Sequence, residues 1–344
     1  VAEYRNNLDA TPRRMIKRQI FQTLRLAVLL TIFVVFLTHR LVFKKIAALV
    51  EAVRKVTAGE LGAQVDEPMP SELKLLGDTL NSMSRRLERV DRERELSMEK
   101  ARRIEEQLHP SLEGISEWPV AWSYRPATDV AGDFFDIRRQ GDSVLFVVGD
   151  VIGHGVSAAL YAAMLKVLFE DAASETKDPA DILSAINRRF LQVSLEEDFC
   201  TMAVAVLDSQ GNTLHYASAG HEPALILQGS EARRTLDSTG PVLGVVDGDA
   251  WETTDLDVRP ADILFLYTDG LPETRSPDGT ALGRERVMRW LQERPPGDLD
   301  SLVGGLMDKA DDFRCSGNRE DDVTVLAARL RDAGADAAAA GDTD

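Results

Sequence analysis

Four short acidic segments carry the residues of this chain that are best suited to chemistry. Each holds one aspartate in its own signature: Asp133 in Val-Ala-Gly-Asp-Phe-Phe-Asp, Asp150 in Gly-Asp-Val-Ile-Gly-His-Gly, Asp269 in Tyr-Thr-Asp-Gly and Asp321 in Glu-Asp-Asp-Val-Thr. The last three adjoin runs of β-forming residues, so strand ends can bring them together although they are far apart in sequence. Packed carboxylates repel one another unless a cation neutralises them, and Mg²⁺ and Mn²⁺ prefer oxygen ligands. The first interpretation is a metal site that performs a reaction.

The segment around Asp150 has the clearest local geometry. An apolar strand candidate, Val-Leu-Phe-Val-Val, leads into Gly149-Asp150, and a helical pattern begins at Val156. Between them, two glycines allow a tight turn that residues with a Cβ rarely adopt. Asp150 is therefore expected on a sharp strand-to-helix turn with backbone groups exposed beside it. A phosphate loop of the P-loop type is disfavoured, because no Gly-Lys-Ser/Thr follows.

Composition limits the possible function classes. The 344 residues suffice for two or three domains, and the net charge of −17 is uneven: residues 1–60 carry seven excess positive charges and the remainder 24 excess negative charges. A basic end beside an apolar stretch indicates a membrane surface. The acidic remainder argues against nucleic-acid binding, which depends on phosphate neutralisation. Cys200 and Cys315 lack metal-ligand spacing, so we expect buried free thiols in a reducing compartment.

An apolar segment near the N-terminus predicts a transmembrane helix. Residues 26–38 are apolar except for threonine, and the stretch extends over residues 20–43 if Arg25, His39 and Arg40 lie near the interfaces. A span needs about 20 residues, and terminal arginines can snorkel. A buried core helix or a signal peptide is the alternative, but no small-residue cleavage site follows. Residues 1–19 form a basic segment, and basic residues on both sides leave the orientation undecided.

Two amphipathic helices are predicted after this span. Apolar residues repeat with 3–4 spacing from Ile46 to Val56 and, beyond a proline-containing connector, from Leu73 to Val90. The second series is a heptad seam, which requires a partner helix. The segments Gly59-Glu60-Leu61, Ser71-Glu72-Leu73 and Asn81-Ser82-Met83 make residues 44–92 resemble a HAMP signalling domain. The usual proline at the start of the first helix is absent, and a plain helical linker is the alternative.

The rest of the chain divides into a stalk, a catalytic region and a tail. The seam continues through residues 93–108 as a coiled-coil linker, which polar Arg94 and Ser97 weaken, and Pro110 ends the helix. We expect a homodimer joined through the HAMP-like region and this coiled coil. Residues 109–331 mix short strands with long helices, which indicates an α+β fold. Strands are predicted at 120–124, 143–149, 201–207, 213–217, 223–228, 262–267 and 323–329, and helices at 156–172, 179–192, 283–293 and 299–312. The acidic tail 332–344 is expected to be disordered.

Five motifs in order make residues 108–331 resemble the SpoIIE/RsbU-type bacterial serine phosphatases, relatives of the metal-dependent type-2C protein phosphatases. They are Ala131-Gly132-Asp133-Phe134-Phe135-Asp136, Gly149-Asp150-Val151-Ile152-Gly153-His154-Gly155, Ala219-Gly220-His221, Thr268-Asp269-Gly270 and Asp321-Asp322-Val323-Thr324-Val325. The resemblance implies an α-β-β-α sandwich with two Mn²⁺ or Mg²⁺ ions at one end of the two sheets.

The resemblance also implies a role for each motif residue. Asp150 would bridge both metals and the Val151 carbonyl would bind one, while Asp269 and Asp321 would complete the ligands. Asp133 would bind directly or through water, and Asp322 is an alternative to Asp321. From its position next to a metal ligand, His154 would either orient that ligand or protonate the leaving serine, and the alternative is that it only supports the turn by hydrogen bonding. His221 is expected to be structural, and the pair Phe134 and Phe135 to fill the core.

Three hypotheses follow from the sequence and the resemblance. The leading one is a protein-serine/threonine phosphatase in the bacterial cytoplasmic membrane, with its phosphatase domain in the cytoplasm. Its substrate would be a phosphorylated regulatory protein, such as an anti-sigma-factor antagonist. A signal would pass through the helices at 103–109 and 156–170 to Asp150. The second hypothesis is a catalytically silent signalling module of the same fold, and the third a two-metal nucleotide cyclase.

Overall fold

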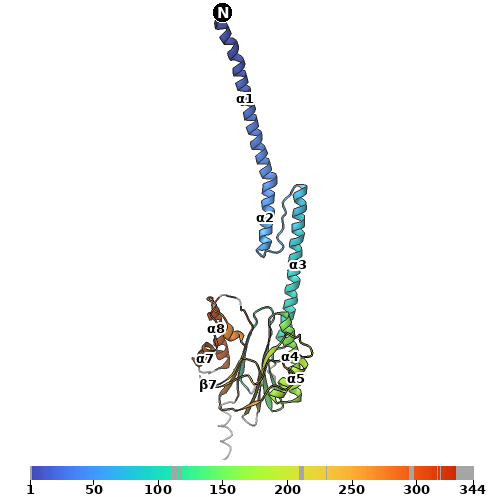
Figure 1. The fold of residues 1–344 in the computed structure, drawn as a ribbon, viewed down its shortest axis with the longest axis vertical. Helices are drawn as coiled ribbons and strands as arrows, with labels where there is room; N and C mark the ends of the chain where they lie inside the picture. Colours follow the sequence, from blue (N-terminus) through green and yellow to red (C-terminus); the bar gives the residue numbers. More distant parts are fainter. Residues whose placement is uncertain are drawn as a thin grey trace, which may run out of the picture. The chain divides into compact units, whose positions relative to one another are not determined.

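The structure is a computed structural model that describes residues 2–110, 115, 118–208, 213–229, 231–293, 298–315, 317 and 319–330. The predicted tail at 332–344 lies outside the described residues. The chain forms two compact units, residues 1–97 and 98–344. The boundary between them falls within helix α3 (Ser71–Gln107). Figure 1 shows the helices of the first unit in blue and the layered second unit in green to red.

The first unit opens with the long apolar helix that the sequence predicts. Helix α1 (Ala2–Thr38) passes through a five-residue π-helical segment, η1 (His39–Phe43), directly into α2 (Lys44–Thr57). Within Met15–Thr57, an 18-residue window has a mean hydropathy of 2.3 and none of it is buried. The hydroxyls of Thr23, Thr31 and Thr38 donate to carbonyls four residues earlier, so these polar groups are satisfied inside the helix. The helix is long and apolar enough to cross a membrane.

The connector between α2 and α3 is held by side-chain hydrogen bonds to α3 and by an ion pair with α2. The side chain of Asn81 on α3 accepts from the amide of Val65 and donates to its carbonyl, at 2.8 and 3.1 Å. Lys45 forms an ion pair with Glu67 at 2.6 Å. Helix α3 continues past Arg94 and Ser97 without a break and ends at Gln107, three residues before Pro110. The apolar side chains of Met83, Leu87 and Val90 on the predicted seam stay exposed on this single chain.

The second unit has two five-stranded antiparallel sheets. One has the order β1-β10-β9-β6-β7 and the other β2-β3-β4-β5-β8. The strands are β1 (Val120–Arg125), β2 (Asp133–Gln140), β3 (Ser143–Val151), β4 (Cys200–Asp208), β5 (Thr213–Ala219), β6 (Ala224–Gln228), β7 (Glu231–Leu236), β8 (Thr254–Asp257), β9 (Asp262–Tyr267) and β10 (Val323–Arg329). The helices are α4 (Val156–Glu175), α5 (Pro179–Phe190), α6 (Gly270–Glu273), α7 (Arg284–Gln292) and α8 (Leu299–Arg314).

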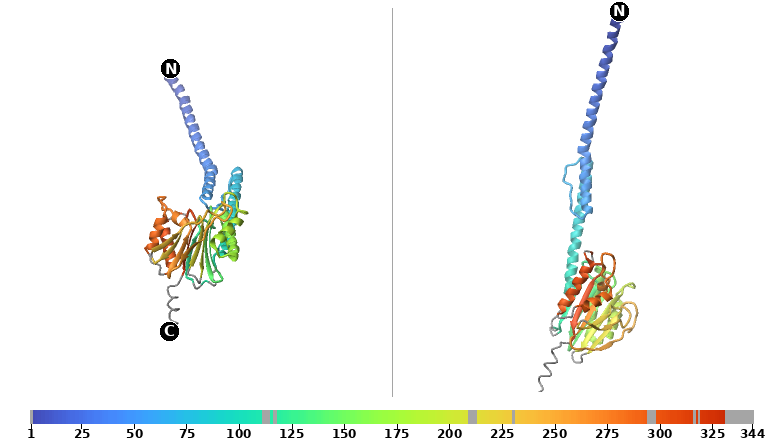
Figure 2. Two further views of the ribbon diagram at one scale, coloured as in Figure 1. Left: turned by 60° about the horizontal axis from the view of Figure 1, so that its bottom comes forward. Right: turned by 90° about the vertical axis from the view of Figure 1, so that its left-hand side faces the viewer.

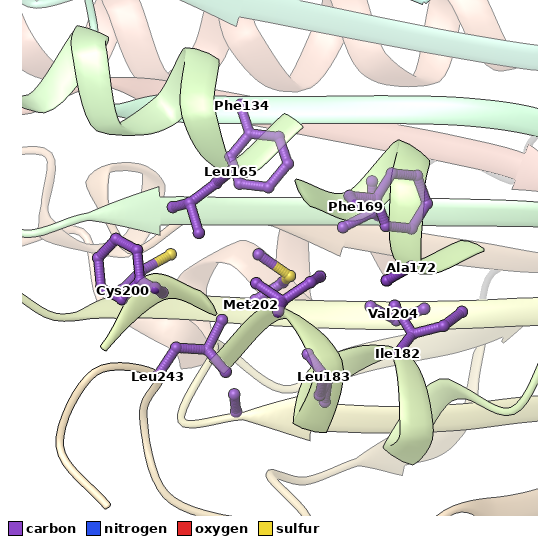
Figure 3. Packing of buried hydrophobic residues seen from close by; sticks show 14 of the residues in the cluster. Phe134, Leu165, Phe169, Ala172, Ile182, Leu183, Cys200, Met202, Val204 and Leu243 are labelled. Atoms are coloured by element: carbon purple, nitrogen blue, oxygen red, sulfur yellow. The ribbon is translucent and has the colours of Figure 1, made fainter. Parts of the chain in front are cut away.

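Three apolar layers hold this unit together. Helices α4 and α5 cover the β2–β8 sheet, and α7 and α8 cover the β1–β7 sheet. A third cluster, which includes Phe135, Phe146 and Leu326, lies between the two sheets. Figure 2 shows the helices on the outer faces of the sheets, and Figure 3 shows Leu165 and Phe169 of α4 packed over Met202 and Val204 of β4. The predicted α-β-β-α sandwich is confirmed.

The structure departs from the sequence-based expectations at a few elements. All predicted strands and helices of this unit are present, but β2, β7, β8 and the short α6 were not predicted. Strand β2 was missed because its second half, Asp136 to Gln140, lacks an apolar pattern; Asp136 is buried because it pairs with Lys166 of α4 at 3.1 Å. Phe134 and Phe135 are buried as expected, in different core clusters. The prediction of buried thiols is confirmed for Cys200 and wrong for Cys315, which lies exposed where α8 ends.

Candidate active site

Strand ends bring the predicted acidic residues to one end of the sandwich. Asp133 opens β2 and is the register partner of Asp150, near the end of β3. Asp269 follows β9, and Asp321 and Asp322 precede β10, the antiparallel neighbour of β9. The end of β9 and the start of β10 therefore coincide in one sheet, as do the end of β3 and the start of β2 in the other. Residues separated by almost 190 positions converge by topology.

Asp133 ties the two sheets together. Its Oδ2 atom accepts hydrogen bonds from the hydroxyls of Thr268 and Thr324, at 2.8 and 2.6 Å. Thr324 lies in β10 of the opposite sheet, Thr268 directly follows β9 of that sheet, and both are buried. Burial and then the charge of Asp150 raise the pKa of Asp133 well above its usual range, while the two hydroxyls act in the other direction. Neither threonine was predicted to belong to the site, although each lies inside an acidic motif.

The carboxylates of Asp150 and Asp269 are repelled by neighbouring carboxylates. The pKa of Asp150 is raised to about 8. Burial is the largest cause, and the charges of Asp269, Asp321 and Asp322 also contribute. Burial likewise raises the pKa of Asp269 to about 6, with Asp321 the next contributor. Carboxylates destabilised in this way bind a cation in preference to remaining charged and unpaired. Asp150, Asp269 and Asp321 thus share one electrostatic environment.

Asp322 has a different environment from its neighbour Asp321. Its Oδ1 atom accepts from the amide of Ala127 and its Oδ2 atom from the amide of Gly132, both at 2.7 Å. The side chain is buried, and burial raises its pKa although the two amides lower it. Both oxygens are therefore committed to the loop that leads into Asp133. Asp321 is only half-buried and lines a cavity at the edge of the site.

Two glycines allow the backbone to pack closely here. A Cβ on Gly132 would lie 2.9 Å from the carbonyl oxygen of Val151, the atom for which the resemblance implies metal binding. A Cβ on Gly270, next to Asp269, would lie 1.9 Å from the carbonyl oxygen of Asp322. Any larger residue would push these segments apart, so both positions require glycine.

The two histidines differ in exposure. His154 is exposed on the turn between β3 and α4 and makes no hydrogen bond to any other residue that the structure describes, which does not support the turn-supporting alternative. His221 is buried, and its Nδ1 atom is 2.7 Å from the hydroxyl of Thr201, the register partner of Asp150. Burial lowers the pKa of His221 to about 4, so it is neutral at physiological pH. This fits the predicted structural role.

The end of the stalk contacts the loop that carries Asp133. Glu105 of α3 accepts hydrogen bonds from the hydroxyl of Tyr124 at 2.7 Å and from the amide of Ala131 at 2.8 Å. The next amide along the chain is the Gly132 group that Asp322 holds. Glu105 also lines a cavity of about 150 Å³ between α3, β2 and α4, together with Leu108 and Leu160. No role was predicted for Glu105, because nothing in the local sequence distinguishes it from the other charged residues of the stalk.

The donor chemistry of the site fits a hard divalent cation. Among the described residues, no three acidic, histidine or cysteine side chains are already arranged as a metal-binding cluster. Three carboxylates and a backbone carbonyl supply only oxygen, the ligand type that Mg²⁺ and Mn²⁺ prefer.

Comparison with known proteins gives two family matches. Residues 140–331 match the family described as Stage II sporulation protein E (SpoIIE), and residues 37–89 match the HAMP domain. Protein IcfG of Synechocystis is 28% identical over 281 residues, which cover 71% of this chain and 44% of that protein. The phosphoserine phosphatase RsbU of Bacillus subtilis is 28% identical over 210 residues, covering 60% of this chain and 61% of RsbU. The chain thus spans 44% and 61% of the lengths of these two relatives.

Solved structures share the fold. The SiaA-PP2C domain of Pseudomonas aeruginosa superposes with a TM-score of 0.64 at 22% identity and covers 70% of this chain and 98% of that domain. The RsbU and RsbW domains of Rv1364c from Mycobacterium tuberculosis give a TM-score of 0.53 at 30% identity, with 62% of this chain and 60% of that chain covered. The first of these similarities extends over nearly the whole of a domain of the PP2C type.

Proposed function

This chain belongs to the SpoIIE family and contains a HAMP domain, and on that premise we propose that it is a metal-dependent protein-serine/threonine phosphatase. The SpoIIE-type domain covers more than half of the chain, from residue 140 to 331. Relatives of this domain include proteins named phosphoserine phosphatases. The observation that carries the proposal is the convergence of Asp150, Asp269 and Asp321 from two sheets into one electrostatic environment.

Each residue of the site has a proposed role. Two Mn²⁺ or Mg²⁺ ions would lower the pKa of the attacking water and neutralise the phosphoryl oxygens during in-line displacement. Asp150 would hold both ions, with Asp269, Asp321 and the carbonyl of Val151 completing the ligands. Asp133 would bind directly or through water with its other oxygen, because Thr268 and Thr324 already occupy Oδ2. Asp322 would position the loop through its two backbone bonds, which favours Asp321 over Asp322 as the ligand.

His154 is the proposed proton donor to the leaving serine oxygen. It lies four residues after Asp150, on the same turn, and its exposed ring makes no hydrogen bond to a described residue that would fix it as a structural histidine. An imidazole can carry a proton near neutral pH, which suits a general acid. No covalent phospho-enzyme is required, because water is the nucleophile.

The N-terminal unit supports a membrane tether. The apolar stretch within Met15–Thr57 and the following HAMP domain would anchor the phosphatase domain at the cytoplasmic face of a bacterial inner membrane. The exposed apolar seam at Met83, Leu87 and Val90 fits a second copy of the chain, as in a HAMP and coiled-coil homodimer. The proposed substrate is a phosphorylated regulatory protein, such as an anti-sigma-factor antagonist.

Glu105 offers a physical route for a signal. A shift of the stalk would pull on the amide of Ala131, and therefore on Gly132 and Asp133, through one carboxylate. Helix α4 lies on the other side of the same cavity and begins five residues after Val151. Movement of α3 against α4 would thus alter the positions of the proposed ligands on β2 and β3.

Hydrolysis of a phosphoserine peptide by the whole chain in detergent, with Mn²⁺, tests the proposal. We expect turnover that chelator abolishes and that Asp150→Asn reduces by more than about 100-fold, since even outer groups around a metal contribute 10–100-fold. The exposed Asp249→Asn is the matched control and should keep wild-type activity. Activity that survives chelator or Asp150→Asn would contradict the mechanism. A folded wild-type chain that binds Mn²⁺ without turnover would favour the silent signalling module.

A further inference from the structure

A second cavity opens beside the acidic residues, on the side of α6 and α8. It measures about 160 Å³, and Gly270, next to Asp269, is part of its lining. Its charged lining consists of three arginines and three acidic residues: Arg275, Arg314, Arg319, Glu273, Glu320 and Asp321. The three arginines come from separate segments: the loop after α6, the end of α8 and the loop before β10. Liquid water occupies about 30 Å³ per molecule, so the cavity has room for a group of a few heavy atoms.

Arg314 and Arg319 have more N–H donors than hydrogen bonds to described residues. Arg314 and Arg319 both bond to the same oxygen, Oδ1 of Asp311, so two positive charges share one carboxylate. The Nε atom of Arg314 is buried and has no hydrogen-bond partner among the described residues. The side chains of Arg314 and Arg319 are only 20% and 17% exposed. A buried guanidinium donor without an acceptor is costly, which favours an incoming acceptor.

Arg275 stands at the open side of the cavity. Its side chain is 49% exposed, and its Nε atom is 3.2 Å from Oε2 of Glu320, an ion pair accessible to solvent. Such a pair contributes little stability and can be exchanged for another oxyanion. The arginines gather in a part of the chain that carries 24 excess negative charges.

We infer that this cavity, here called the arginine pocket, binds an oxyanion group of the substrate protein next to the reacting phosphoserine. Guanidinium groups bind carboxylate and phosphate through paired N–H donors, so the ligand is either an acidic side chain flanking the phosphoserine or the phosphoryl group itself. The inference rests on the proposed phosphatase function, since it names a substrate feature for the same site. It makes the pocket a determinant of which phosphoproteins are bound.

The test measures binding to the full chain in detergent, in an Asp150→Asn background that prevents turnover. The probes are a phosphoserine peptide with flanking glutamates, the same peptide with glutamines, and p-nitrophenyl phosphate. Arg319→Ala and Arg275→Gln should each weaken binding of the glutamate peptide by about tenfold, as expected for one lost charge-assisted bond. The exposed Arg289→Ala on α7 removes the same charge outside the pocket and should leave all affinities unchanged.

The pattern of losses identifies the group that is bound. If affinity falls only for the glutamate peptide, the pocket binds a flanking carboxylate. If affinity falls equally for all three probes, the pocket binds the phosphoryl group. Unchanged affinity of Arg275→Gln and Arg319→Ala for every probe, with wild-type melting temperatures, overturns the inference. Absence of turnover in the chain that keeps Asp150 would refute the proposed phosphatase function, whereas these binding results would still decide the role of the pocket.

Discussion

Replacing Asp321 and Asp322 one at a time by asparagine should separate two adjacent acids that have opposite roles. In Asp322→Asn, the single amide oxygen can accept from Ala127 or from Gly132 but not from both. The NH₂ group then faces a backbone N–H donor, and one buried amide loses its partner. Asp321 accepts one backbone bond, from the amide of Asp322 to Oδ1 at 2.8 Å, which the oxygen of an asparagine can still accept. Asp321→Asn therefore needs to break no bond of this kind, and it removes a like charge from near Asp150 and Asp269. The first change should destabilise the fold, and the second should not.

The magnitude follows from the lost hydrogen bond. A bond to a charged acceptor contributes about 1.5–3 kcal/mol, and leaving a buried amide unpaired costs about 1–3 kcal/mol. The neutral asparagine avoids part of the desolvation cost that raises the pKa of Asp322, so a net loss of about 2 kcal/mol is expected. In a domain of this size, each kcal/mol lowers the melting temperature by about 2–4 °C. Asp322→Asn should therefore melt about 4–8 °C below the wild type.

The assay is thermal unfolding of both variants in chelator, followed by turnover of a phosphoserine peptide with Mn²⁺. Asp321→Asn should keep or raise the melting temperature in chelator, yet lose more than about 100-fold in activity, as expected for a metal ligand. Raising the Mn²⁺ concentration should recover more activity in Asp322→Asn than in Asp321→Asn. The reasoning is refuted if Asp322→Asn melts like the wild type while Asp321→Asn is destabilised.

Two further predictions concern the stalk and the buried histidine. Glu105→Ala removes the acceptor for Tyr124 and Ala131 and should lower activity or apparent Mn²⁺ affinity by about 10–100-fold. Glu106→Ala, which removes only a surface pair with Arg102, should change little, and equal effects of the two would contradict a link between stalk and site. The pKa of His221 is about 4 when folded and 6.5 normally, so the folded state disfavours its protonation. The contribution of the neutral His221 to the free energy of unfolding is fully present above pH 6.5 and is lost as the pH falls toward 4. This loss amounts to at most about 3 kcal/mol. Denaturant unfolding should show that the free energy of unfolding decreases less from pH 7 to pH 4.5 in His221→Gln than in the wild type. Equal decreases in the two proteins would contradict this account.

Local patterns in the sequence identified most of the elements and the residues that converge. The apolar stretch near the N-terminus, the heptad spacing from Leu73 to Val90 and the strand next to each acidic motif depend on short-range periodicity, which a single sequence displays. Strand β2 was missed because half of it is polar, and its burial depends on Lys166, a residue of another element. Periodicity cannot reveal a buried polar pair of this kind.

Residue types and their order along the chain were enough to predict that Asp133, Asp150, Asp269 and Asp321 could share a metal. The roles of the neighbouring residues became visible in the folded structure. It assigned both oxygens of Asp322 to backbone amides, one oxygen of Asp133 to Thr268 and Thr324, and Glu105 to the loop before β2. The physical reason is that a hydrogen bond requires donor and acceptor to meet within about 3 Å at a favourable angle. Across two packed sheets, strand register sets that geometry, and the spacing of residues along the chain does not.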